Sequence, residues 1–246
     1  MVDASIEYNA DFIDSYQLLY LKKKNGKLLS FTEKKLPKEK LVMGSLEDDI
    51  RILDMYTYIK GKLIKRELVK DLQFDESLSR YEDLLFEHEV KTRIKNYVFL
   101  NRIIYFYFQR EDSLVNTLGK KHLCYIDAME KVKHIYINHS KEIQEKVESM
   151  LFTNAILTLF TKVIKNDDSL DDNTKLCKES MKRIIDIFPN YEKNQNISKS
   201  IKRFVKKYSN NDKKLRKIVK KARKIDFIKW YFKYLSIFNK YKYKFN

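Results

Sequence analysis

Residues 74–89 read FDESLSRYEDLLFEHE, and the predicted fold depends on the pattern in this stretch. Its first half is rich in turn-forming residues, and Glu82 and Asp83 then open a segment of helical apolar periodicity. Acidic side chains in a first helical turn lie near unsatisfied backbone N–H groups, which favours their ionised form. The pattern therefore predicts a helix from about Tyr81 to Ile94 that begins with two carboxylates.

Two interpretations of this helix start are open. It is either an ordinary helix terminus, or it holds a carboxylate at the lip of a pocket, where it can take a proton from a hydroxyl group. The flanking sequence bears on the choice. KLIKRE lies upstream at residues 62–67, and an aromatic stretch at residues 102–109 lies downstream and leads into Arg110 and Ser113.

This succession of KLIKRE, FDE, a helix opened by ED, and an aromatic strand ending in R-x-x-S resembles the second half of a family 2 glycosyltransferase catalytic domain, of the GT-A fold. The resemblance covers roughly residues 1–117. It implies an inverting transfer from a nucleotide-sugar donor to a membrane-linked glycan or cell-surface polysaccharide acceptor. It gives Asp83 the role of general base, with Glu82 beside it. The residues implied to contact the donor diphosphate or the acceptor are Arg110, Ser113 and Lys62.

The family also has parts that this sequence lacks. A nucleotide-binding half and a D-x-D motif for Mg²⁺ or Mn²⁺ precede the region of resemblance, and the four glycines cannot form a Gly-rich phosphate loop. We therefore expect a truncated enzyme that is inactive alone, a piece of a split gene whose partner is a separate donor-half polypeptide, or a remnant that binds without reacting. The acidic run of residues 47–49 falls at a predicted helix start near Ser45 rather than in a loop after a strand, so no metal site or cofactor is expected here.

The composition favours a globular, helix-rich protein. Hydrophobic residues make up 43% of the 246, which supports a buried core, and only 4 Gly and 2 Pro are present. Cys124 and Cys177 show no metal-ligand spacing, as expected of reduced thiols. The sequence shows neither a signal-peptide pattern at residues 1–12 nor an apolar run of the roughly 18 residues needed to span a bilayer. A cytoplasmic location, peripheral on the inner face of the cell membrane, is the expectation.

The predicted fold class is α/β: a partial GT-A-like mixed sheet without its nucleotide-binding half, followed by an α-helical region. Residues 1–116 form the acceptor-side half, with a hairpin about Asn25-Gly26 and strands at 96–100 and 102–109. Residues 117–190 form a helical appendage, and residues 191–246 form a basic tail. Because strands of the missing half are absent, a sheet edge and an apolar face should be exposed.

The net charge of +17 is concentrated in residues 191–246, which hold 19 Lys and Arg against 3 acids. Lysines there alternate with apolar and aromatic residues, a pattern typical of a helix at an anionic membrane surface. The predicted membrane contacts are Trp230, Tyr231, Tyr234, Phe238, Lys229 and Lys233. Two alternatives remain: the aromatic residues pack on residues 117–190, or the chain is a non-enzymatic basic protein that binds a membrane surface or nucleic acid. Nucleic acid is disfavoured because a nucleic-acid binder needs neither the ED pair nor R-x-x-S.

Overall fold

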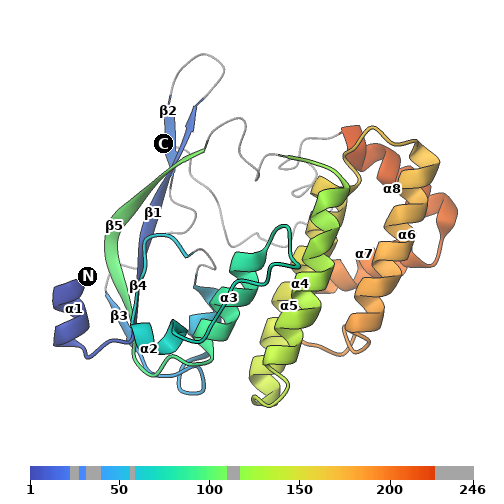
Figure 1. The fold of residues 1–246 in the computed structure, drawn as a ribbon. Coiled ribbons are helices and arrows are strands. Elements are labelled where there is room, and N and C mark those ends of the chain that lie inside the picture. Colours follow the sequence, from blue (N-terminus) through green and yellow to red (C-terminus); the bar gives the residue numbers. More distant parts are fainter. Residues whose placement is uncertain (23–27, 32–39, 56–58, 110–116, 225–246) are drawn as a thin grey trace. The chain divides into compact units, whose positions relative to one another are not determined.

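The computed structural model describes residues 1–22, 28–31, 40–55, 59–109 and 117–224. The chain forms two compact units. The sheet unit comprises Met1–Glu76 and Glu82–Asn116, and the helical unit comprises Ser77–Tyr81 and Thr117–Asn246. Figure 1 shows the strands gathered in the sheet unit and the long helices in the helical unit.

The sheet unit is built on two long parallel strands, β1 (Phe12–Lys22) and β5 (Tyr97–Gln109). The strand order is β2-β1-β5-β3, with β4 (Leu63–Ile64) also pairing with β1. β2 (Leu28–Phe31) runs antiparallel to β1, which confirms the predicted hairpin, although its Asn25-Gly26 turn lies outside the described residues. β3 (Leu41–Met43), which the sequence did not predict, pairs antiparallel with β5. The mixed sheet followed by helices confirms the predicted fold class.

β5 corrects the prediction of two strands at 96–100 and 102–109. It is one strand whose register against β1 shifts: Ser15 pairs with Leu100, and the next residue of β1 pairs with Ile103. Extra residues on one strand make a β-bulge, which explains why the alternation breaks in the sequence while the strand continues. Beyond the bulge, Ile104 is 40% exposed and Phe106 is 53% exposed. An exposed apolar stretch is therefore present on this sheet, as predicted.

The short helices of the sheet unit are α1 (Val2–Glu7), the 3₁₀ helix η1 (Ile50–Asp54), α2 (Arg66–Val69) and α3 (Glu82–Lys91). The α-helix predicted to start at Ser45 is instead a turn followed by η1. Asp48 accepts hydrogen bonds from both the N–H and the hydroxyl of Ser45 (2.9 and 2.6 Å), and Asp49 accepts from the Arg51 N–H at 3.0 Å. The carboxylates of Asp48 and Asp49 thus form hydrogen bonds that stabilise the turn in which they lie.

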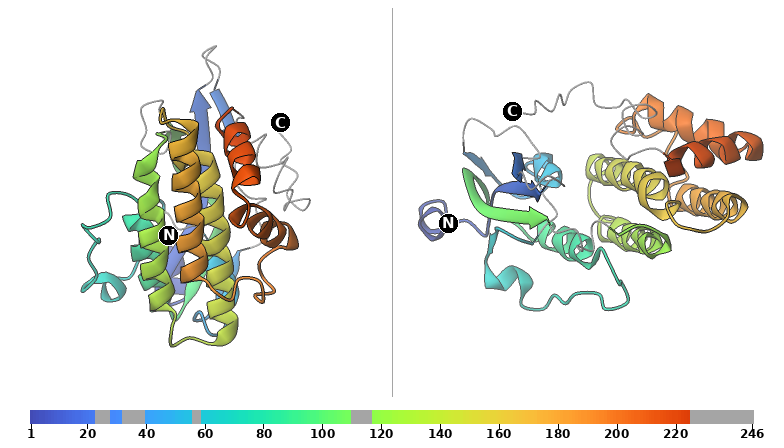
Figure 2. Two further views of the ribbon diagram at one scale, coloured as in Figure 1. Left: turned by 90° about the vertical axis from the view of Figure 1, so that its right-hand side faces the viewer. Right: turned by 90° about the horizontal axis from the view of Figure 1, so that it is seen from above.

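The helical unit contains η3 (Lys120–Leu123), α4 (Cys124–Ile135), α5 (Lys141–Thr158), the π turn η4 (Leu159–Val163), α6 (Leu170–Ile187), α7 (Lys199–Ser209) and α8 (Asp212–Lys224). Ser140, Ser169 and Ser198 cap α5, α6 and α7 with their side-chain oxygens. Figures 1 and 2 show α4, α5 and α6 running beside one another. None of the helices in the described ranges is long and apolar enough to cross a membrane.

The segment Ser77–Tyr81 belongs to the helical unit although it directly precedes α3. The Tyr81 hydroxyl lies 2.6 Å from Nδ1 of His122, and its ring meets Tyr125 edge-on with centroids 4.9 Å apart. Tyr81 has a φ of 64°, a left-handed conformation that costs a bulky residue about 1 kcal/mol or more. These contacts hold the strained residue in place immediately before Glu82.

Candidate active site

The helix start that the sequence predicted is present, with Glu82 and Asp83 in the first turn of α3. Asp83 is half-buried, and its pKa is raised above the ordinary value, first by burial and then by the negative charge of Glu82. The backbone N–H of Leu84 and the positive charge of Lys60 oppose this rise. A carboxylate with a raised pKa is a stronger base than an exposed one, as general-base chemistry requires.

Lys60 is a charged neighbour of Asp83 that the sequence did not suggest. It stands before Gly61, whose φ is 72° and where an added Cβ would lie 2.9 Å from the Cβ of Tyr105. Ser15 donates a hydrogen bond from its hydroxyl to the Gly61 carbonyl at 3.0 Å, so this turn is fastened between β1 and β5. The Lys60 ammonium lies 4.6 Å from the centroid of the Tyr107 ring. The sequence signal that could have indicated Lys60 is the K-G-K triplet, because a glycine between two lysines allows a turn that points them in different directions.

Behind Asp83 the sheet unit contains a buried cluster of charges from four segments, formed by Asp14 of β1, Lys62, Glu87 and Lys91 of α3, and Tyr97 of β5. The Lys62 ammonium forms an ion pair with Glu87 and lies 3.9 Å from Asp14. The Tyr97 hydroxyl donates to Asp14 at 2.9 Å, and Lys91 donates to the Met55 carbonyl at 3.0 Å. The cluster therefore joins α3 to the two central strands.

Burial dominates the electrostatics of this cluster. It raises the pKa values of Asp14 and Glu87 despite the attraction of Lys62, and it raises the pKa of Tyr97 well above its ordinary value. The pKa of His88 is lowered well below its usual value by burial and by Lys91, so this histidine is neutral. One carboxylate oxygen of Glu87 makes no hydrogen bond. Buried charges of this kind hold one geometry because any rearrangement leaves a charge unpaired.

Asp83, Glu87 and Lys91 follow one another at four-residue spacing, so they lie on one stripe of α3. The stripe runs from half-buried Asp83 to fully buried Glu87 and Lys91. The lower part of the stripe is held by the cluster, and this fixes the rotation of the helix that presents Asp83.

The structure corrects the role predicted for Lys62. Its side chain is 0% exposed and its ammonium is engaged by Glu87, so it is not placed to contact a diphosphate or an acceptor. The K-G-K turn explains the error, because it directs Lys62 into the core and leaves Lys60 exposed. Lys60 is the lysine of this pair whose charge acts on Asp83.

The remaining predicted residues lie outside the described ranges. These are Arg110 and Ser113, and the predicted membrane contacts Trp230, Tyr231, Tyr234, Phe238, Lys229 and Lys233. Across the residues that the structure does describe, no group of three or more His, Cys, Asp or Glu side chains could hold a metal ion. The residues that the structure describes thus offer no ligand cluster for the divalent cation that the family resemblance implies.

Comparison with known proteins shows the fold. No known protein family and no curated protein matches the sequence. Among solved structures, the chain is similar to S. aureus TarS residues 1–349, a glycosyltransferase, in complex with UDP (13% identity, TM-score 0.62, 90% of this chain and 61% of that chain). The structure of TarS 1–349 without UDP gives 13% identity and a TM-score of 0.63, over 90% of this chain and 60% of the other. The chain thus has a glycosyltransferase-like fold and spans about three fifths of these structures.

Proposed function

We propose that the chain carries the acceptor side of a sugar-transfer site, with Asp83 as the general base. The observation that carries this proposal is the half-buried Asp83 carboxylate at the start of α3, whose pKa is raised by burial and by Glu82. In such a reaction Asp83 takes the proton of an acceptor hydroxyl while its oxygen attacks the anomeric carbon of the donor. The carbon–oxygen bond to the nucleoside diphosphate breaks, and its electron pair leaves with the diphosphate.

The donor in this proposal is a nucleotide-sugar, and the glycosyltransferase-like fold and a structural neighbour bound to UDP support a UDP-sugar as the first choice. The acceptor is a membrane-linked glycan or cell-surface polysaccharide. Arg110 and Ser113 remain predicted contacts for the diphosphate or the acceptor, because a forked guanidinium suits phosphate oxygens. A separate donor-half polypeptide that supplies the metal motif is part of the same proposal.

The experiment measures UDP release from a set of UDP-sugars, in the presence of a cell-envelope glycan extract, by the chain alone and with a donor-half polypeptide added. Asp83→Asn should lower the rate by about 10²–10⁴-fold, the usual effect of removing a general base. Its unfolding curve should stay close to that of the unaltered chain, since the substitution keeps the shape of the side chain. Equal rates for both proteins would exclude the base role, and no UDP release from any donor in either setting would contradict the proposed reaction.

The pH dependence of the same rate gives an independent check on the neighbours of Asp83. The base must be ionised, so the rate should fall as the pH drops through its raised pKa. Glu82→Gln removes a charge that raises this pKa and should move the acid limb to lower pH, whereas Lys60→Met removes a charge that lowers it and should move the limb to higher pH. Shifts in the same direction for both variants would show that another group controls the limb.

A further inference from the structure

Helices α7 and α8 of the helical unit carry an unusually one-sided charge. Together they contain ten lysines and three arginines against a single acid, Asp212. Figure 2 shows the two helices at one side of their unit. Charge of this density on packed helices is more than solubility requires.

The apolar residues of both helices are used inside the helical unit. α8 packs against α6 and η4, and the Phe204 ring of α7 meets Phe160 edge-on with centroids 5.1 Å apart. The buried apolar residues are Ile201, Phe204, Val205, Leu215, Ile218, Val219 and Ala222. These helices therefore have no apolar face available for insertion into a bilayer, and whatever they contact outside the unit meets their polar face.

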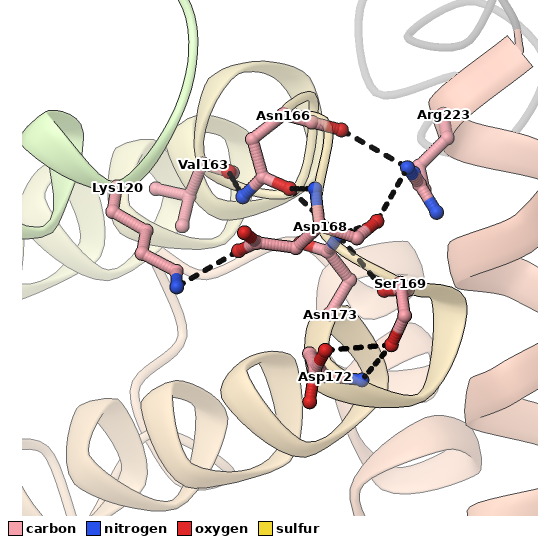
Figure 3. A network of polar contacts seen from close by, with 8 residues as sticks. All are labelled: Lys120, Val163, Asn166, Asp168, Ser169, Asp172, Asn173 and Arg223. Atoms are coloured by element: carbon pink, nitrogen blue, oxygen red, sulfur yellow. Dashed lines mark hydrogen bonds and ion pairs between the residues drawn. The ribbon is translucent and has the colours of Figure 1, made fainter.

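Two arginines of α8 are also used within the unit. The Arg223 guanidinium donates to the carbonyl oxygens of Asn166 and Asp168 at 3.0 and 2.8 Å, as Figure 3 shows. Arg216 pairs with Asp171 of α6 at 2.8 Å. Both arginines of α8 thus bind this helix to neighbouring segments of the helical unit, and the cations on its solvent-exposed surface that remain are lysines.

The outward lysines of α8 form a regular stripe. Lys213, Lys217, Lys220 and Lys224 are all exposed and recur at spacings of four, three and four residues, which places them on one face. We call these four residues the lysine face. The structure gives none of the four an ion-pair partner among the described residues. Like charges at this spacing repel one another, so an anionic partner would relieve a repulsion that the isolated protein bears.

A hollow continues the lysine face at the C-terminal end of α8. Its volume is about 680 Å³, and its charged lining comprises four cations against one acid: Lys165, Lys220, Arg223 and Lys224, and Asp167. A space of this size with cations at its wall suits a phosphate-bearing headgroup better than it suits an apolar molecule.

We propose that the lysine face docks the protein on an anionic phospholipid surface through headgroup phosphates. This inference is independent of the transfer reaction. Nucleic acid presents phosphates too, but sequence-specific and single-strand binders also read bases with arginine forks or stack them on aromatic rings. Here Arg216 is engaged by Asp171, and Arg223 by two backbone carbonyls. Tyr208, the last aromatic residue of α7, is half-buried, with its ring centroid 4.8 Å from that of Phe204. Binding to anionic lipid headgroups requires only clustered positive charge on an amphipathic helix, and the lysine face provides such a cluster.

The test is sedimentation of the full chain with vesicles of phosphatidylcholine, with and without phosphatidylglycerol. Binding should require phosphatidylglycerol and should weaken as salt is added. The variant with Lys213, Lys217, Lys220 and Lys224 all changed to Gln removes four positive charges and keeps polar side chains of similar helix propensity. It should bind about fivefold more weakly for each lysine removed, and by several hundredfold in all, since each lysine contributes about 1 kcal/mol at such a surface.

A matched control changes four exposed lysines elsewhere in the helical unit, Lys121, Lys175, Lys182 and Lys193, to Gln, and alters the net charge equally. This control should retain nearly all of the binding, and melting curves should show both variants folded. Unaltered vesicle binding by the lysine-face variant would overturn the proposal, as would equal losses in the two variants. Duplex RNA could also be added to the vesicle-bound chain. If RNA displaced the chain at a phosphate concentration below that of the phosphatidylglycerol, the proposal would be overturned in favour of nucleic acid.

Discussion

Lys62 illustrates at the scale of one residue how a buried charge constrains a site. Its ammonium is 0% exposed, pairs with Glu87, and lies 3.9 Å from Asp14. Both carboxylates have pKa values raised by burial, with Lys62 as the largest influence in the opposite direction. Lys62 is thus the cation that most favours the charged forms of the two buried carboxylates, and Lys91 adds a second contribution.

Lys62→Met should lower the free energy of unfolding by about 3–5 kcal/mol at neutral pH, because it leaves a buried carboxylate unpaired. Removing Lys62 raises the folded-state pKa values of Asp14 and Glu87 further. A carboxylate with a raised pKa stabilises the fold below its unfolded pKa, and this contribution is lost as the pH rises through the folded value. Urea unfolding should therefore show a larger loss at pH 7 than at pH 4.

Lys65→Met is the control for that measurement, because the Lys65 side chain is 50% exposed and its pair with Asp11 spans 3.5 Å. It should cost about 0–1 kcal/mol at either pH. The double variant Lys62→Met with Glu87→Leu removes both charges of the pair and should recover much of the lost stability. A loss from Lys62→Met that does not change with pH would contradict the electrostatic explanation.

At the scale of elements, α8 is joined to the start of α6 by hydrogen bonds rather than by apolar contact alone. Figure 3 shows the turn at residues 166–169, where Asn173 donates its side-chain N–H to Asn166, Asp168 and Ser169, and where Arg223 donates to two backbone carbonyls. The Asp168 carbonyl thus accepts from both Asn173 and Arg223, and the Asn166 carbonyl accepts from Arg223. Arg223 thus links α8, on which it lies, to the turn before α6.

Arg223→Ala should lower the free energy of unfolding by about 2 kcal/mol, since charge-assisted hydrogen bonds are among the stronger ones and two of them are lost. The Asn166 carbonyl loses its bond from Arg223, and the Asp168 carbonyl keeps only its bond from Asn173. Arg216→Ala is the matched change on the same helix. Its ion pair with Asp171 is exposed on both sides, so the cost should be about 0–1 kcal/mol. Chemical unfolding of both variants measures the difference, and equal costs would refute the special role of Arg223.

The starts of four helices show how far local sequence signals reach. The acids of α3 and the serine caps before α5, α6 and α7 are local signals, and they mark helices that the structure contains. Local signals failed where strand pairing determines the structure. β3 has only three residues, and the bulge in β5 breaks the alternation of the sequence although the strand continues to pair with β1. The buried cluster was missed for a related reason, because Asp14, Glu87 and Lys91 look like surface residues until the four segments of the cluster come together in the fold.

At the scale of the whole molecule, the exposed apolar surface of the sheet is the main liability. Val42 of β3 is 53% exposed and Ile104 of β5 is 40% exposed. Solvent-exposed apolar residues on a sheet favour association with other chains.

Changing Val42 and Ile104 to Thr should reduce concentration-dependent self-association, as followed by size-exclusion chromatography with light scattering. Threonine keeps the β-branched shape that strands favour, so the free energy of unfolding should change little. Val98→Thr, at a fully buried position of β5, should instead destabilise the sheet unit without reducing association. Association that persists unchanged in the surface variant would place the contact elsewhere.

The parallel pairing of β1 with β5 has a consequence for synthesis on the ribosome. β1 ends at Lys22 and its partner begins at Tyr97. At roughly 5–20 residues per second, about 4 to 15 s pass between the two strands, and β1 must wait through this interval without its main neighbour. Helices α4 to α8 make contacts nearer in sequence and can form soon after they emerge. The nascent sheet unit is thus the part of the chain most in need of a chaperone, because the order of translation exposes β1 before the longer strand β5 with which it pairs.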